Sequence, residues 1–143
     1  MPYRYLDDIA VADVAFEAWG ATMEEMFAAS ADALMNVMVE ELATIEDHQS
    51  LEISVEHAEA DLLLFNFLNE LIFYKDARRL LLRVSALTIS RRSGLFALHA
   101  VLSGEEIDPA RHQLNVDVKA VTLHRFRVEE TGTGWKATVI LDI

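Results

Sequence analysis

Hydrophobic residues in this chain follow two different periods, and the order in which the periods occur limits the possible folds. Two segments, residues 22–41 and 59–75, place apolar residues at the spacing of an α-helix. Six segments alternate apolar and polar residues as half-buried strands do: 11–19, 51–55, 80–90, 95–102, 119–129 and 135–143. The turns at 91–94 and 131–134 are short enough for hairpins. The sequence therefore predicts an α+β fold, with two long helices packed on a mainly antiparallel sheet of about six strands.

The two helical segments differ in how they begin and in how far they should be buried. Thr22 followed by Glu25 has the pattern of a capping box, which predicts the start of the first helix. The second segment is apolar except for Asn66, Asn69 and Glu70, so we expect most of it to be buried across a sheet. Strands and helices do not alternate, and there is no glycine-rich phosphate loop. A doubly wound nucleotide-binding fold is therefore disfavoured.

Length and composition predict one domain over residues 1–143. The 143 residues are 52% hydrophobic, which suffices for a core and argues against disorder. The most apolar stretch is too short and too often interrupted to cross a membrane. The first residues lack a secretory or transit pattern, so we expect a cytoplasmic protein without membrane contacts. The absence of cysteine excludes disulfides, thiolate zinc sites and cysteine nucleophiles.

Charge is distributed unevenly along the chain. The net charge is −12, and residues 1–76 contain 17 acidic against 2 basic residues, whereas residues 77–143 contain 7 against 10. Because affinity for RNA depends on basic side chains, we expect no tight RNA binding by the chain alone. The acidic half suits a cation or a basic protein partner, and a merely solvated acidic surface explains the same bias.

The last expected strand provides the candidate metal ligands. Asp142 lies on its polar face, and the carboxylate of Ile143 adjoins it if the chain ends there. Two hard oxygen ligands so close favour Ca²⁺ or Mg²⁺, provided that another acid joins them. Asp13 is the candidate, because aspartate is disfavoured within a strand and a residue that breaks a local rule often marks a functional site. A frayed polar end and a solvent-exposed Asp13 are the alternatives.

Lys119 is the candidate basic residue beside these acids. A regular hairpin centred near residues 132–133 places Asp142 opposite about Leu123, so Lys119 extends a few residues past the chain end. A cation there can pair with the terminal carboxylates or contact a partner's phosphate, and an ordinary surface lysine is the alternative. The five histidines show no metal-ligand spacing, and no Ser/His/Asp arrangement follows from spacing alone. The sequence therefore offers no catalytic residues.

Five sequence blocks, taken in order, resemble the archease family. They are Ala12-Asp13 with Gly20, Asp61-Leu-Leu with Phe67-Leu-Asn-Glu-Leu71, Gly104-Glu105, Lys119-Ala-Val-Thr-Leu-His124 and Val139-Ile-Leu-Asp-Ile143. No single block is decisive, but the ordered set is specific and spans nearly the whole chain. Archeases are small cytosolic accessory proteins of the RtcB-type RNA ligase, which joins tRNA exon halves and repairs broken RNA.

The resemblance implies a protein that is not itself an enzyme. Its role would be to promote guanylylation of the ligase and to restore the ligase for repeated turnover, meeting RNA only through the ligase. The resemblance also implies a divalent cation, typically Ca²⁺ with Mg²⁺ as the alternative, held by Asp13, Asp142 and Ile143, with Lys119 as the ligase-activating residue. A chaperone-like modulator of an RNA-modifying enzyme, such as a tRNA methyltransferase, is the second function that the family suggests.

One block departs from the family pattern. The usual His-Thr-Ala-Asp is replaced here by Ala10-Val11-Ala12-Asp13, so the histidine and the threonine are lost. If that histidine assists the ligase reaction, this chain has weaker or altered activity. The residues that match the metal ligands are intact.

Overall fold

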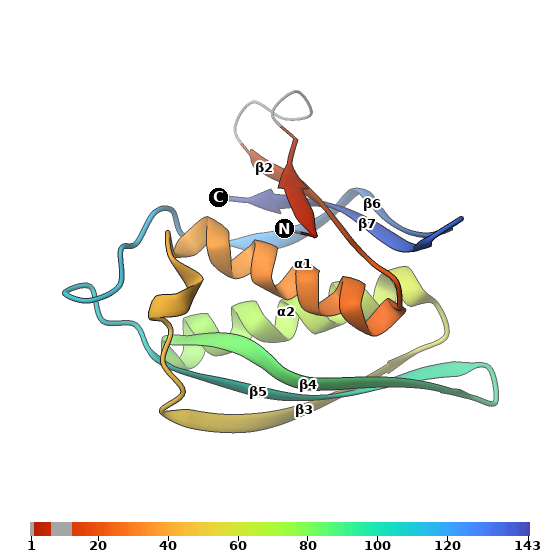
Figure 1. Cartoon of the computed structure of the whole chain (residues 1–143), viewed down its shortest axis with the longest axis horizontal. Coiled ribbons are helices and arrows are strands. Elements are labelled where there is room, and N and C mark those ends of the chain that lie inside the picture. Colours follow the sequence, from red (N-terminus) through yellow and green to blue (C-terminus); the bar gives the residue numbers. More distant parts are fainter. Residues whose placement is uncertain (1, 7–12) are drawn as a thin grey trace.

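The structure, a computed structural model, describes residues 2–6 and 13–143. Two antiparallel sheets enclose two helices, as Figure 1 shows. The four-stranded sheet has the order β1-β2-β7-β6, and the three-stranded sheet has the order β3-β5-β4. The elements are β1 (Tyr3–Tyr5), β2 (Asp13–Gly20), α1 (Met23–Met38), η1 (Leu42–Thr44), β3 (Gln49–His57), α2 (Ala60–Arg78), β4 (Leu80–Arg92), β5 (Leu95–Glu106), β6 (Ala120–Thr131) and β7 (Gly134–Asp142).

The α+β class, the two helices and all six expected strands are confirmed, but the single sheet is wrong. The described residues contain seven strands in two sheets, and both helices lie between the sheets and contact strands of each. This position explains why α2 is apolar around most of its circumference. The short strand β1 was not expected, and the start of the first expected strand, residues 11 and 12, lies outside the described residues.

Both helices differ in extent from the prediction. Helix α1 ends at Met38 rather than at residue 41, because Val39 adopts extended backbone angles and forms an isolated bridge with Leu114. Helix α2 begins at Ala60 and continues to Arg78, where Arg79 takes a left-handed conformation with φ of 54°. Between the helices, the rings of Phe27 and Phe67 stack with their centroids 6.0 Å apart. This contact lies in the core between the two sheets.

The expected cap by Thr22 is present at the start of α1, with Glu25 reaching back to Ala21, one residue before the N-cap, and the contribution of Thr22 can be measured. The Thr22 hydroxyl accepts a hydrogen bond from the Glu25 N–H at 3.1 Å, and the Glu25 carboxylate accepts one from the Ala21 N–H at 3.0 Å. Thr22→Ala should lower the free energy of unfolding by about 1 kcal/mol, because a helix N–H loses its acceptor. Urea denaturation measures this loss. Thr22→Ser, which keeps the acceptor, should stay near wild type; equal losses in both variants would contradict the assignment.

No helix in residues 2–6 and 13–143 combines the length and the apolar composition that crossing a bilayer requires.

Candidate functional site

The pairing of β2 with β7 brings two predicted ligands to one end of the four-stranded sheet. Asp13 lies directly opposite Asp142, at the end of an unbroken ladder that runs to the pair Gly20 and Trp135. Side chains of directly opposed residues project from the same face, with Cβ atoms about 4.5–5.5 Å apart. Asp13 is half-buried and Asp142 is exposed. Two carboxylates opposed in this way repel each other unless a positive charge lies between them.

The other two predicted residues adjoin this pair. Ile143 follows Asp142 directly and packs in part against the core. The Lys119 N–H donates to the carbonyl oxygen of Asp142 at 2.8 Å, and the Lys119 side chain is exposed. All four predicted site residues therefore lie at one end of the four-stranded sheet, where β2 and β6 begin and β7 ends. Ala10 and Val11, where the sequence departs from the family pattern, lie outside the described residues.

The expected register of the last hairpin is wrong by three residues. Asp142 pairs with Ala120 rather than with Leu123, because β6 contains a large bulge between Thr122 and Arg127. Within the bulge, Arg125 has a φ of 53°, and the ring of Phe126 meets that of Phe65 on α2 edge-on at 5.6 Å. The bulge takes up the residues that a regular strand would have placed beyond the chain end. It thereby brings Lys119 next to Asp142.

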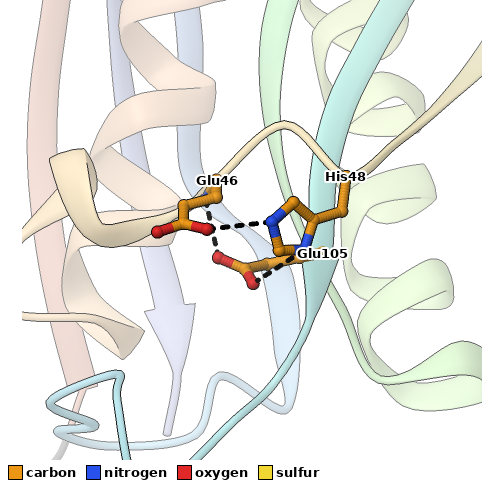
Figure 2. A group of neighbouring side chains, drawn as sticks. All are labelled: Glu46, His48 and Glu105. Atoms are coloured by element: carbon orange, nitrogen blue, oxygen red, sulfur yellow. Dashed lines mark hydrogen bonds and ion pairs between the residues drawn. The ribbon is translucent and has the colours of Figure 1, made fainter.

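A second group of charged side chains was not expected from the sequence. Glu105, at the end of β5, is only 5% exposed in its side chain and receives hydrogen bonds from three groups. Its carboxylate accepts from Arg111, from the Glu46 N–H at 2.6 Å and from His112 Nε2 at 3.0 Å. His48 lies beside both glutamates, as Figure 2 shows, with Nε2 2.8 Å from Glu46 and Nδ1 3.6 Å from Glu105.

The electrostatics of this group fix the charge of Glu105. Burial alone raises the pKa of the carboxyl, but the hydrogen bonds from Arg111, the Glu46 amide and His112 outweigh it and lower the pKa to about 2. His112 Nδ1 accepts the Asp108 N–H at 2.9 Å, so its Nε2 carries the proton that Glu105 accepts. Glu105 is therefore an ionised carboxylate that ties the turn at 108–112 to the segment before β3.

The same group has the spacing of a metal site. Glu46, His48 and Glu105 offer ligand atoms that all lie within 4.8 Å of one another. However, Arg111 already supplies a positive charge, with Nη2 on Glu105 and Nη1 3.6 Å from Glu46. A cation would have to displace this guanidinium. The arrangement therefore suits the joining of two loops better than metal binding. Sequence spacing could not reveal it, because 59 positions separate Glu46 from Glu105.

Comparison with known proteins identifies similar sequences over almost the full chain. The model described as the Archease protein family (MTH1598/TM1083) matches residues 3–143. Protein archease of Pyrococcus furiosus is 34% identical over 133 residues, which cover 92% of this chain and 93% of that protein. Protein archease of Methanosarcina acetivorans is 30% identical over 142 residues, covering 99% and 95% respectively.

Two solved structures share the fold. The solution structure of protein 1598 from Methanobacterium thermoautotrophicum superimposes with a TM-score of 0.86 at 28% identity, and the match covers 99% of both chains. The crystal structure of "an archease, possible chaperone" from Thermotoga maritima has a TM-score of 0.63 at 18% identity, covering 94% of this chain and 93% of that one. At that identity the second comparison speaks for the fold alone.

Proposed function

This chain belongs to the archease family, and from that premise we propose that it is a metal-binding accessory protein of an RtcB-type RNA ligase. In this role it promotes guanylylation of the ligase and its repeated turnover, while the ligase carries out the chemistry. Its contact with RNA is made through the ligase, in keeping with the net charge of −12.

The observation that carries the proposal is the opposition of Asp13 and Asp142 across β2 and β7. Carboxylate oxygens are the ligands that Ca²⁺ and Mg²⁺ prefer, and the chain has no cysteine that would favour a softer metal. Asp13, Asp142 and the Ile143 carboxylate that the family resemblance implies would hold the ion. A cation here would offset the repulsion of the two aspartates and tie together the ends of β2 and β7.

Lys119 supplies the group that would meet the ligase. Its backbone N–H is bound to the carbonyl oxygen of Asp142, and its side chain is exposed. A flexible ammonium is a point charge suited to a phosphate, so Lys119 would contact a phosphate group at the nucleotide site of the ligase.

A guanylylation assay tests this function. A purified RtcB-type ligase is incubated with labelled GTP, and the transfer of GMP to the ligase is followed with and without the chain at substoichiometric amounts. We expect faster transfer and more ligation events per ligase molecule. An unchanged rate and turnover would contradict the proposal. If the chain instead only prevented heat aggregation of the ligase, a chaperone-like role, which the words "possible chaperone" ascribe to the Thermotoga maritima relative, would replace it.

Lys119→Ala should lower the stimulated guanylylation rate several-fold without changing the stability of the chain. The side chain is exposed, so its removal costs the fold little, whereas a phosphate contact would be lost. The matched control is Lys136→Ala on β7, whose ammonium lies 3.6 Å from Glu17 at the other end of the strand. Guanylylation kinetics equal to wild type in Lys119→Ala would reduce Lys119 to an ordinary surface residue.

A further inference from the structure

Lys75, near the end of α2, is a buried lysine whose side chain is only 5% exposed. Its ammonium donates to Asp76 at 2.5 Å, to Asp117 at 2.6 Å and to the carbonyl oxygen of Val118 at 2.9 Å. These three acceptors use all three of its N–H groups. Burial lowers the pKa of Lys75, but the hydrogen bonds and charges of Asp117 and Asp76 outweigh it and raise the pKa above its usual value. The side chain is therefore charged at neutral pH.

A buried ammonium is a costly way to stabilise a core. The two carboxylates that pair with the Lys75 ammonium, those of Asp76 and Asp117, are themselves exposed, so the ammonium lies at the boundary between the core and the surface segment that carries Asp117. Two of its three acceptors, Asp117 and Val118, lie more than 40 positions along the chain in the segment that leads into β6. Lys75 thus joins the end of α2 to this segment.

The joined segment ends at the proposed ligase-contacting residue. Residues 107–119 contain no helix and no strand, apart from the isolated bridge between Leu114 and Val39. Lys75 fixes the two positions immediately before Lys119, and the next polar contact along the chain is the hydrogen bond from the Lys119 N–H to Asp142. A continuous series of contacts therefore runs from α2 through Asp117 and Val118 to the corner that holds Asp13 and Asp142.

We infer that Lys75 is a positioning residue, which holds the backbone at 117–118 so that the Lys119 N–H stays bound to Asp142. The inference rests on the proposed function for the role of Lys119, but the positioning itself is a property of the isolated chain. It predicts that removal of the Lys75 ammonium lowers the stimulation of the ligase only because Lys119 is no longer held in place.

The first experiment needs no ligase. Hydrogen exchange of the Lys119 amide is measured by NMR in wild type, in Lys75→Met and in the matched variant Lys136→Met. We expect exchange at Lys119 to accelerate about tenfold or more in Lys75→Met, while the Trp19 amide, bound to the Pro2 carbonyl oxygen, stays protected in all three. If Lys75→Met does not fold, Asp117→Ala removes the ion pair between Lys75 and this segment from its exposed side and leaves the bond to the Val118 carbonyl oxygen. Unchanged exchange at Lys119 in the folded variant overturns the inference.

The second experiment uses the guanylylation assay with Lys75→Met, Lys119→Ala and the double variant, each at a concentration that saturates the ligase. We expect the two single variants to lose stimulation to a similar extent and the double variant to lose no more than Lys119→Ala alone. Additive losses would overturn the inference, because Lys75 would then act independently of Lys119. If Lys119→Ala itself has no effect, the proposed role of Lys119 fails, whereas the exchange of its amide still decides whether Lys75 positions it.

Discussion

Asp142→Asn is expected to weaken Ca²⁺ binding to the isolated chain by about 100-fold or more, since even groups outside the metal's own ligands change affinity 10- to 100-fold. The same substitution should stabilise the chain in the presence of a chelator. Asp142 faces Asp13 directly, and like charges opposed across two strands destabilise a sheet. Asp142→Asn should therefore raise the stability of the chain when the metal is removed and lower it when the metal is in excess. Calorimetric titration measures the affinity, and thermal unfolding in EDTA and in excess Ca²⁺ measures the stability.

Two matched variants separate this result from general charge effects. Asp47→Asn removes the same charge from an exposed position. It should leave the Ca²⁺ affinity unchanged, and its effect on stability should be the same in EDTA and in excess Ca²⁺. Adding one residue after Ile143 converts its carboxylate into an amide, which should weaken Ca²⁺ binding while leaving the Asp13–Asp142 repulsion in place. Wild-type Ca²⁺ affinity in Asp142→Asn would contradict the proposed metal site. Wild-type affinity in the extended chain would contradict only the role of the Ile143 carboxylate.

Glu105→Gln is expected to lower the free energy of unfolding at neutral pH by about 3 kcal/mol. The carboxyl has a pKa of about 2 in the folded chain against 4.5 as the ordinary value, and this difference corresponds to about 3 kcal/mol of stabilisation of the ionised form. Because the folded pKa is the lower one, this stabilisation is complete well above pH 4.5 and is lost as the pH falls towards 2. Urea denaturation between pH 7 and pH 2.5 measures it.

The exposed neighbour Glu106 provides the control for this prediction. Glu106→Gln should have little effect at any pH. The difference in stability between wild type and Glu105→Gln should shrink as the pH is lowered through this range, because the carboxyl of the unfolded wild-type chain is protonated below pH 4.5 and folding then has to release that proton. A difference that does not depend on pH, or a loss no larger than that of Glu106→Gln, would show that the hydrogen bonds of Glu105 contribute no charge-dependent stability.

Hydrophobic periodicity was enough to predict the helices and six strands, because it shows which side of each element is apolar. It could not show that the strands divide between two sheets, because a buried strand face has the same pattern whichever layer covers it. The bulge in β6 was also hidden, since Arg125 adopts a positive φ without a glycine to mark it. The register of Asp142 was therefore predicted three residues away from its observed partner, Ala120.

A site residue such as Asp13 could be predicted from its immediate sequence neighbours, whereas the buried charges of Glu105 and Lys75 could not. Asp13 stood out because aspartate breaks the rule for a strand, and the ladder then places it opposite Asp142. Glu105 and Lys75 look like ordinary charged residues in the sequence. Their burial depends on partners 59 and 42 positions away, Glu46 and Asp117, which only the tertiary fold brings near.

The bulge in β6 also determines how another protein can approach this end of the molecule. β6 is an edge strand of the four-stranded sheet, and a regular edge offers a row of unpaired N–H and C=O groups to which a foreign strand can add. Here that row is broken midway by the bulge, whose residues Leu123, His124 and Arg125 are exposed. Strand addition and edge-to-edge aggregation are thereby disfavoured along β6, so a partner at this corner must recognise side chains rather than extend the sheet.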